Sequence, residues 1–282
     1  MSRHVAIVTD STAYLPRPTM ERHGITAVPL TVVLGDRALE EGTEISARSL
    51  ALALQKRHSV TTSRPSPEVF AAAYRAAAEG GADAVVSLHL SSEFSGTYDA
   101  ARLAAKDAPV PVRVVDTGMV VAMALGFCAL AAAEAAEAGG GLDEAVSAAE
   151  KRAAGTSAYF YVDTLDYLRR GGRIGAAQAL LGSALAVKPI LELDGGRIEM
   201  LEKVRTASKA IARLEEIVAE RAGAAPVDIA VHHLAAQERA DRLAERLRER
   251  VPGLVDLHVS EVGAVIGAHT GPGLLGAVIS LR

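Results

Sequence analysis

Short apolar runs that alternate with helical patterns constrain the fold of this chain more than any other feature of its sequence. Four runs have the length and composition of buried strands: VAIVT (5–9), TAVPLTVVL (26–34), AVVSLHL (84–90) and VRVVD (112–116). Helical patterns occupy most of the intervals, at about 46–57, 66–79, 96–106, 118–138 and 142–153. Strands that alternate with helices predict an α/β fold in which helices cover both faces of an open parallel sheet.

The pattern changes after about residue 154. A strand AYFYV (158–162) and helices near 164–169 and 175–186 are followed by two extended runs, VKPILEL and RIEMLEKV. Asp194-Gly195-Gly196 joins these runs, which indicates a hairpin. PVDIAVHHL and LVDLHVS then flank an amphipathic helix at about 235–249, which predicts a mixed sheet. We therefore expect two packed α/β domains, 1–154 and 155–282, with a crevice where they meet.

Composition excludes several classes of protein. The 282 residues are 50% hydrophobic, and 30 basic against 34 acidic residues give a net charge of -4, with no basic run of the kind that binds nucleic acid. The single cysteine, Cys128, excludes a disulfide framework within the chain and a cysteine-rich zinc site. The first residues contain no apolar stretch long enough for a signal peptide, so we expect a reducing, cytoplasmic location.

The longest uncharged run, Thr117 to Ala133, does not predict a transmembrane segment. It has 17 residues, fewer than the roughly 20 that a bilayer requires. It is rich in alanine and is followed by Glu134 and Glu137 at helical spacing. We interpret it as a buried helix.

A glycine motif near the C-terminus has the spelling of a dinucleotide site without its context. GPGLLG (271–276) matches G-x-G-x-x-G, which needs a following helix whose N-terminus meets the pyrophosphate. The chain ends six residues later, and AVISL has the pattern of a strand. No G-x-x-x-x-G-K-[ST] sequence occurs either, so no nucleotide cofactor is predicted.

The segment SSEFSGTYDAA (91–101) places five hydroxyl side chains between a strand and a helix. Ser95 can cap that helix, and it can also act as a nucleophile with His269 as base and Asp116 or Asp10 as the orienting group. Ser95 lies in F-S-G rather than in the G-x-S-x-G elbow of serine hydrolases, which disfavours the esterase alternative.

Histidine spacing does not predict a metal site. The eight histidines form no H-E-x-x-H pattern and the chain has no cysteine pair, while the adjacent His232 and His233 would face opposite sides of a strand.

The segment LRRGGRIG (168–175) crowds three arginines around two glycines that end a helix. Arg169, Arg170 and Arg173 can stabilise the negative end of the helix dipole, or they can face a carboxylate, a phosphate or an acidic partner. The sequence alone leaves both interpretations open.

Six motifs together resemble the DegV family. They are Asp10-Ser11-Thr12, Thr62-Ser63-Arg64-Pro65-Ser66, Ser95-Gly96-Thr97-Tyr98, Leu168-Arg169-Arg170-Gly171-Gly172-Arg173-Ile174, Lys188-Pro189-Ile190 and His269-Thr270-Gly271-Pro272-Gly273. They extend from about residue 5 to residue 280 in the order expected for that family.

The resemblance implies a bacterial fatty-acid-binding protein without catalytic residues of its own. It implies two α/β domains, with the acyl chain in a buried tunnel and the carboxylate near the domain junction. The partner that it implies is an ATP-dependent fatty-acid kinase, which phosphorylates the bound fatty acid for phospholipid metabolism. No cofactor or metal is implied beyond the fatty acid as ligand.

The same resemblance assigns the head-group contacts residue by residue. The positions that match the family's carboxylate-holding motifs are Thr62, Ser63, Ser95, Gly96, Thr97 and His269. Arg169, Arg170 and Arg173 match positions at the pocket mouth or at the partner surface. The chain departs from the family pattern at Tyr14, Glu41, Arg64 and Phe94, and none of these departures removes a carboxylate-holding hydroxyl. A carrier of another amphiphile is the remaining alternative.

Overall fold

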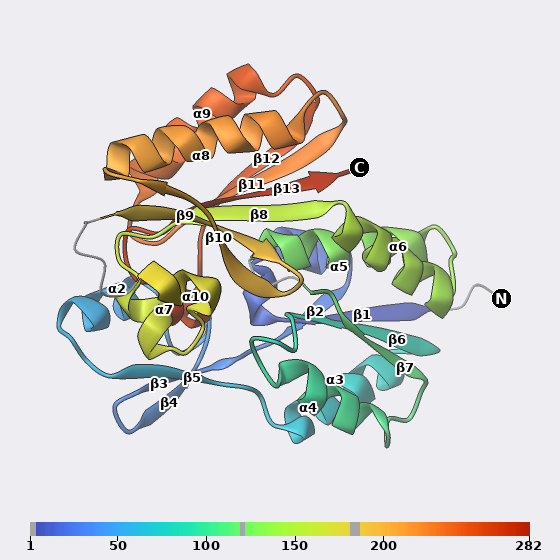
Figure 1. Cartoon of the computed structure of the whole chain (residues 1–282). Coiled ribbons are helices and arrows are strands. Elements are labelled where there is room, and N and C mark those ends of the chain that lie inside the picture. The colour runs from blue at the N-terminus through green and yellow to red at the C-terminus, as the bar shows by residue number, and fades with distance from the viewer. Residues whose placement is uncertain (1–3, 119–121, 181–186) are drawn as a thin grey trace. The chain divides into compact units, whose positions relative to one another are not determined.

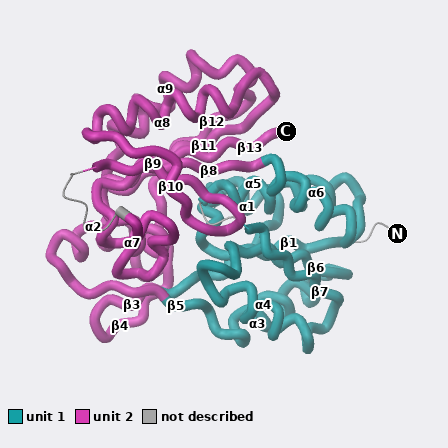
Figure 2. The backbone as a smooth tube through the Cα atoms, viewed as in Figure 1, with its two compact units in different colours: residues 1–31, 63–155 teal, residues 32–62, 156–282 magenta. Residues whose placement is uncertain are grey.

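The computed structural model describes residues 4–118, 122–180 and 187–282 (Figure 1). Contacts within the chain divide it into two compact units (Figure 2). The first unit comprises residues 1–31 and 63–155, and the second comprises residues 32–62 and 156–282. Each unit has its own sheet.

A four-stranded parallel sheet forms the centre of the first unit, as predicted. Its order is β2-β1-β6-β7, with the strands β1 (Val5–Asp10), β2 (Ile25–Val28), β6 (Ala84–His89) and β7 (Val112–Asp116). Helices α3 (Pro67–Glu79) and α4 (Thr97–Ala105) pack on one face, and α5 (Met123–Glu137) and α6 (Leu142–Ala154) pack on the other (Figure 1). Two short helices, η1 (Ser11–Ala13) and α1 (Arg17–Arg22), connect β1 to β2.

Helix α5 confirms the buried-helix interpretation of the uncharged run. Every side chain from Met123 to Ala129 is buried, because both the sheet and α6 pack against this helix. The part of the predicted helix at 119–121 lies outside the described residues. Among the described helices, none combines the length and the apolar character needed to cross a bilayer.

A six-stranded mixed sheet forms the centre of the second unit, in the order β10-β9-β8-β13-β11-β12. Its strands are β8 (Thr156–Tyr161), β9 (Lys188–Asp194), β10 (Arg197–Val204), β11 (Val227–His233), β12 (Leu254–Glu261) and β13 (Leu275–Leu281). β11 and β12 are parallel, and the other pairs are antiparallel. The hairpin predicted at Asp194-Gly195-Gly196 joins β9 to β10. Helices α8 (Ala207–Ala222) and α9 (Gln237–Arg250) pack on the sheet through a common apolar core.

Smaller elements of the second unit carry several of the sequence motifs. They are the three-stranded sheet β4-β3-β5, with β3 (Thr31–Leu34), β4 (Arg37–Glu40) and β5 (Val60–Ser63), and the helices α2 (Ala47–Gln55), α7 (Asp166–Arg170), η2 (Gly175–Leu180) and α10 (Ala264–Thr270). The helix predicted at 175–186 is described only as the short helix η2, and residues 181–186 lie outside the described part of the chain.

Two expectations from the sequence differ from the structure. The run 26–34 is not one strand but two, β2 and β3, which belong to different sheets. Pro29 stands between them and has no N–H group for a sheet ladder.

Residues 32–62, placed in an N-terminal domain 1–154, instead belong to the second unit. The reason is packing against α10. The Glu41 carboxylate accepts a hydrogen bond from the Val265 N–H at 2.8 Å, and α2 contacts α10 where Leu50 lies against Gly267. The second division falls after Gly155, one residue beyond the predicted boundary.

Candidate ligand-binding site

Ser95 and Thr97 form a hydroxyl pair at the start of α4 in the first unit. The two hydroxyl oxygens are 2.8 Å apart, and Ser95 Oγ also accepts the backbone N–H of Thr97 at 3.3 Å. The prediction that Ser95 is the N-cap is wrong, because the N-cap is Gly96, but the Ser95 hydroxyl still accepts the N–H of Thr97, the first residue of the helix. A pair of hydroxyls that share one hydrogen bond keeps one O–H group free to donate. This free donor can bind a carboxylate oxygen.

Arg64 is a residue that sequence reasoning did not assign to the site. Its side chain lies against Gly96, where a Cβ atom would meet the guanidinium and come within 2.9 Å of Arg64 Cδ. The Arg64 side chain is exposed, and none of the described residues pairs with it. A free cation therefore lies beside the Ser95–Thr97 pair. Ser63 is exposed and its hydroxyl donates to the Arg64 carbonyl at 3.2 Å.

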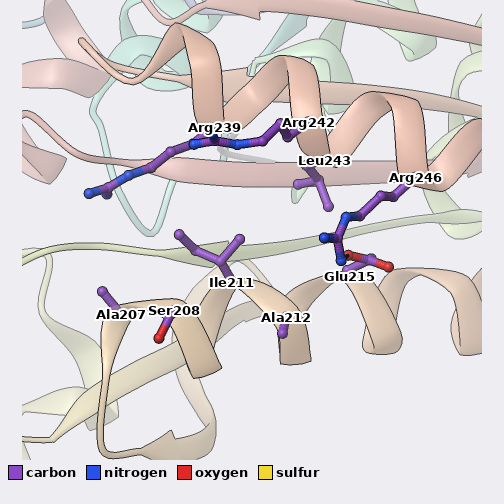
Figure 3. Close-up of a pocket in the computed structure, with 9 residues that line it drawn as sticks. All are labelled: Ala207, Ser208, Ile211, Ala212, Glu215, Arg239, Arg242, Leu243 and Arg246. Atoms are coloured by element: carbon purple, nitrogen blue, oxygen red, sulfur yellow. Dashed lines mark hydrogen bonds and ion pairs between the residues drawn. The ribbon is translucent and has the colours of Figure 1, made fainter.

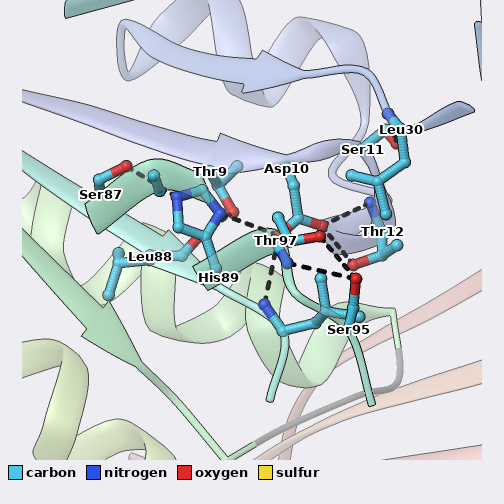
Figure 4. Close-up of polar contacts among 12 residues, drawn as sticks. Thr9, Asp10, Ser11, Thr12, Leu30, Ser87, Leu88, His89, Ser95 and Thr97 are labelled. Carbon is cyan, nitrogen blue, oxygen red and sulfur yellow. Dashed lines mark hydrogen bonds and ion pairs between the residues drawn. The ribbon is translucent and has the colours of Figure 1, made fainter. Parts of the chain in front are cut away.

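A buried chain of hydrogen bonds lies at the ends of β1 and β6 (Figure 4). The Tyr74 hydroxyl donates to Ser87 Oγ at 2.9 Å, and Ser87 Oγ lies 2.8 Å from His89 Nε2. His89 Nδ1 lies 3.0 Å from an oxygen of Asp10, and that oxygen also accepts the Leu90 N–H at 3.2 Å. Burial raises the pKa of Tyr74 to about 12, so its hydroxyl stays protonated.

This network holds two of the sequence motifs in place. The other Asp10 oxygen accepts the backbone N–H and the hydroxyl of Thr12, which closes the Asp10-Ser11-Thr12 turn. Asp10 also reaches the chain at Leu90, where the Ser91–Gly96 segment begins. A buried carboxylate with this many donors is fully satisfied and rigid. Asp10 thus connects the first motif to the loop that carries Ser95.

The hydrogen bonds of this network have the same order as in a Ser-His-Asp catalytic triad, with Ser87, His89 and Asp10 as its members. Unlike a catalytic serine, Ser87 is not accessible to a substrate. All three side chains are 0% exposed, and Ser87 Oγ already accepts a hydrogen bond from Tyr74. A nucleophile must reach its substrate, so this triad of contacts is a structural network rather than a catalytic one.

Thr62 and His269 form a second polar pair, in the second unit. His269, in the last turn of α10, places Nε2 at 2.8 Å from the hydroxyl oxygen of Thr62, which lies on β5. Burial, followed by the positive charge of Arg173, lowers the pKa of His269 to about 4, so the imidazole is neutral at pH 7. Its Nδ1 is buried and has no hydrogen-bond partner among the described residues.

The unpartnered Nδ1 decides the direction of the hydrogen bond to Thr62. If Nδ1 carried the proton, a buried N–H would lack an acceptor, which costs more than leaving a lone pair unused. The favoured tautomer carries the proton on Nε2, which then donates to Thr62. The Thr62 hydroxyl hydrogen is left free to donate to a ligand.

The LRRGGR segment shapes the surroundings of His269. Gly171 follows α7, and a Cβ atom there would collide with the His269 ring at Nδ1. Gly172 has a φ of 71°, which turns the chain back. Arg173 Nη1 donates to the Gly171 carbonyl at 2.7 Å. The glycine pair therefore allows the close approach that holds the imidazole.

The other two arginines of this segment face outward. Arg169 is exposed and lies 3.6 Å from the Asp166 carboxylate, and Arg170 is exposed with its guanidinium 6.0 Å from the centre of the Tyr167 ring. Of the three arginines predicted at a pocket mouth or partner surface, only Arg173 contacts the site built around His269.

The described residues do not assemble the esterase alternative. A histidine base needs an acceptor that orients its second nitrogen, and His269 Nδ1 has no such partner in the described part of the chain. Asp10 is bonded to His89, and the Asp116 oxygens accept the N–H groups of Ser92 and Gly118. Among the described residues, no group of three or more histidine, cysteine or acidic side chains can hold a metal ion.

A groove of about 480 Å³ lies between α8 and α9 in the second unit (Figure 3). Ile211 and Leu243 supply apolar surface, and Arg246 forms an ion pair with the mostly buried Glu215 at 3.1 Å. The residues assigned to a carboxylate do not line this groove. It is therefore separate from the Thr62–His269 pair.

Comparisons with known proteins agree with the order of motifs. The DegV family model matches residues 4–282. A DegV domain-containing protein of Streptomyces coelicolor is 83% identical over 282 residues and covers 100% of both chains. Two solved structures are similar over nearly the whole chain. A DegV family protein from Thermus thermophilus, described as binding fatty acid, has 35% identity and a TM-score of 0.93, covering 99% of this chain and 100% of its own. DegV of Bacillus subtilis, described as a fatty acid binding protein, has 38% identity and a TM-score of 0.91, covering 100% of both chains.

Proposed function

The chain belongs to the DegV family, and on that premise we propose that it binds a long-chain fatty acid and presents the carboxylate to a separate ATP-dependent kinase. The relatives from Thermus thermophilus and Bacillus subtilis, both above 30% identity, are described as fatty-acid-binding proteins. The protein itself supplies binding and orientation, and the kinase supplies the phosphoryl transfer that makes an acyl phosphate for phospholipid metabolism.

The observation that carries this proposal is the Thr62–His269 pair. A neutral histidine donates to Thr62, and the Thr62 hydroxyl keeps its own hydrogen for a carboxylate oxygen. The Ser95–Thr97 pair offers a second hydroxyl donor of the same kind. We assign both donors to the fatty-acid carboxylate.

Neutral donors suit a carboxylate that must react. Burial of an alkyl chain contributes about 0.8 kcal/mol per methylene, so some fourteen methylenes contribute on the order of 11 kcal/mol before the costs of binding. Affinity can therefore come from the tail, and the head group needs orientation only. Hydroxyl donors orient the carboxylate without the bidentate neutralisation that an arginine imposes, so the carboxylate stays nucleophilic toward a phosphoryl group.

The exposed Arg169 and Arg170 are assigned to the kinase contact. Both guanidinium groups face outward from α7, close in sequence to the glycines that hold His269. Exposed arginines favour an acidic partner surface through charge complementarity. This assignment connects the partner surface to the same loop that positions the head-group residues.

The first test is extraction of the purified protein with organic solvent, followed by mass spectrometry. We expect a bound long-chain fatty acid, and we expect the delipidated protein to take up added oleate or palmitate. A different extracted amphiphile would identify the protein as a carrier of that compound, and an empty protein that takes up neither fatty acid would contradict the proposal.

The second test addresses the head group. Thr62→Val keeps the shape of the side chain and removes the donor, and Thr61→Val, at the exposed neighbouring position of β5, is the matched control. We expect Thr62→Val to lower oleate affinity about tenfold, the loss of one hydrogen bond to a charged group. Thr61→Val should leave it unchanged. Equal affinities for the two variants would remove Thr62 from the site.

The third test measures phosphorylation of the bound fatty acid by the kinase. It compares Ser95→Ala with Ser92→Ala, a control in the same loop. Kinase-dependent phosphorylation of the bound fatty acid should fall with Ser95→Ala alone. If the purified protein instead hydrolysed activated esters without a kinase, and Ser95→Ala abolished that turnover, the esterase alternative would replace the carrier.

A further inference from the structure

A second cavity, of about 600 Å³, lies in the second unit at the end of β11. It is lined where β11 and β12 end, where α9 begins and where the Pro272-Gly273 loop passes. Ligand sites of α/β sheets gather at the carboxyl ends of parallel strands, and β11 and β12 are the parallel pair of this sheet. None of the residues assigned above to the fatty-acid carboxylate lines this cavity.

His233 brings an unpartnered buried donor to this cavity. Its side chain is 2% exposed, and Nδ1 accepts the backbone N–H of Ala236 at 3.4 Å. Because Nδ1 is the acceptor, the ring proton is on Nε2. Nε2 is buried and has no hydrogen-bond partner among the described residues. A buried N–H of this kind is costly unless a ligand supplies the acceptor.

Arg239, in the first turn of α9, brings a second unpartnered buried donor to the cavity. Its Nη1 is buried and makes no hydrogen bond to any described residue. Its nearest charged contact is Asp163 Oδ1 at 3.7 Å, and that oxygen already accepts the Tyr161 hydroxyl at 2.6 Å. Arg242, one turn further along α9, is exposed and has no partner in the described part of the chain. The three groups together favour an oxyanion.

The carboxylates of the cavity restrict which oxyanion fits. Asp163, Glu238 and Glu261 all line it, so the two arginines face three acidic groups. Glu261 Oε1 accepts the Ala235 N–H at 2.9 Å, and its other oxygen accepts no hydrogen bond from the described residues. A fully ionised anion such as sulfate would meet repulsion from these carboxylates. A phosphate group that keeps one P–OH can donate that hydrogen to a carboxylate while its other oxygens accept from the histidine and arginine donors.

The backbone conformation around the cavity lets the chain pass close to the cavity side chains. Ala235 has a φ of 51° and Gly273 a φ of 89°, both in the left-handed region, and a Cβ atom on Gly273 would collide with the Asp163 carboxylate. The N-cap of α9, Ala236, has no side-chain cap, so this 14-residue helix presents its free N-terminal N–H groups. Pro272 and Gly273 of the GPGLLG motif thus line the same cavity as the N-terminus of α9.

We propose that this cavity binds a protonated phosphate group, either as inorganic phosphate or as a small phosphate monoester. His233 Nε2, Arg239 and Arg242 donate to the phosphate oxygens, and a carboxylate of the cavity accepts the P–OH hydrogen. The proposal does not depend on the fatty-acid site, because its residues and its ligand are different.

The test is isothermal titration of the purified full chain with inorganic phosphate, sulfate and glycerol 3-phosphate in separate arms. We expect saturable binding of at least one phosphate compound and sulfate at least about tenfold weaker, as the loss of one charge-assisted hydrogen bond predicts. Tighter binding of glycerol 3-phosphate would identify a monoester as the ligand, and tighter binding of phosphate would identify the free ion.

Three variants of cavity residues and one control test the assignment. Arg242 is exposed, so Arg242→Gln should leave the fold intact. We expect this variant to bind phosphate about tenfold more weakly. His233→Leu should abolish binding, and His233→Gln, which keeps a donor near Nε2, should restore part of it. Arg248→Gln, in the last turn of α9, should have no effect. The proposal is overturned if neither phosphate compound binds saturably, if sulfate binds as tightly, or if Arg242→Gln and His233→Leu both bind like the parent protein.

Discussion

One buried histidine of the first unit and two of the second differ in their hydrogen bonding. In the first unit, both ring nitrogens of His89 have partners, Ser87 on one side and Asp10 on the other. In the second unit, His269 and His233 each have one nitrogen partnered and one nitrogen buried without a partner among the described residues. A buried network with every group satisfied holds the fold in place, whereas the histidines of the second unit leave part of their hydrogen-bonding capacity unused.

The comparison separates residues whose hydrogen bonding is complete from residues that keep a free donor. Asp10 and His89 carry no free donor or acceptor, and they position the loop that leads to Ser95. Thr62 retains one free hydroxyl hydrogen because of its neutral histidine partner. Substitutions of Asp10 or His89 should therefore lower stability, whereas substitution of Thr62 should lower binding.

The largest expected effect is His89→Leu. It leaves the fully buried Asp10 carboxylate without its imidazole partner, and removing one hydrogen-bond partner of a buried charged group costs about 3 kcal/mol. Urea unfolding followed by circular dichroism measures the loss, and hydrogen exchange of the β1 and β6 amides assigns it to the first unit. Tyr74→Phe, which removes only the outer end of the network, should cost about 1 kcal/mol. Equal losses for the two variants would show that the network is not centred on Asp10.

Acid should destabilise the second unit through its neutral histidines. Burial lowers the pKa of both His232 and His269 to about 4, whereas the unfolded chain protonates histidine near pH 6.5. The unfolded state therefore binds more protons as the pH falls from 7 to 5, and the free energy of unfolding drops by about 2 kcal/mol for each of these histidines.

Urea unfolding of lipid-free protein at pH 7 and pH 5 checks this, with His269→Gln as the comparison. The variant should lose less stability between the two pH values than the parent protein. An unchanged pH dependence in the variant would mean that His269 does not contribute.

A smaller effect compares two glycines, one from each unit. Gly171→Ala drives a methyl group into the His269 ring, which Thr62 holds, and overpacking of this kind costs about 1–3 kcal/mol. Gly96→Ala meets the exposed end of Arg64, which can move aside, so its cost should stay below about 1 kcal/mol.

Oleate binding of both variants completes this comparison. Gly171→Ala should weaken binding because it displaces His269 from Thr62, whereas Gly96→Ala should retain most of the affinity. If Gly96→Ala weakened oleate binding more than Gly171→Ala, the contact at Gly96 in the first unit would be the more sensitive of the two.

Much of the secondary structure follows from hydrophobic periodicity. The parallel sheet of the first unit, the buried helix α5 and the β9–β10 hairpin all have strong local patterns, and the sequence predicts them. The segment after Pro29 does not, because β4 and β5 have four residues each and are largely exposed. Their place in the second unit depends on contacts between Glu41 and Val265 that lie 224 positions apart.

The sequence named the residues of the candidate site but not the contacts among them. The motifs named Thr62, Ser95 and His269, and the structure adds that His269 pairs with Thr62 while Ser95 pairs with Thr97. The Asp10–His89 pair escaped prediction because its two residues are 79 positions apart, and no local pattern shows that the ends of their two strands meet. Arg64 was noticed only as a departure from the family pattern, and its approach to Gly96 gives it a place beside the hydroxyl pair.

The sequence by itself determined the α/β class, the order of most elements and the polar residues that can contact a ligand, because periodicity and residue chemistry are local properties. Only the tertiary structure decided which hydrogen atoms remain free to donate. The free hydrogen of Thr62 depends on a histidine 207 positions away, and the unpartnered Nε2 of His233 depends on a turn at Ala235 and Ala236. Hydrogen-bond satisfaction is a property of the folded environment, so a buried donor can be recognised as unsatisfied only after all its neighbours are in place.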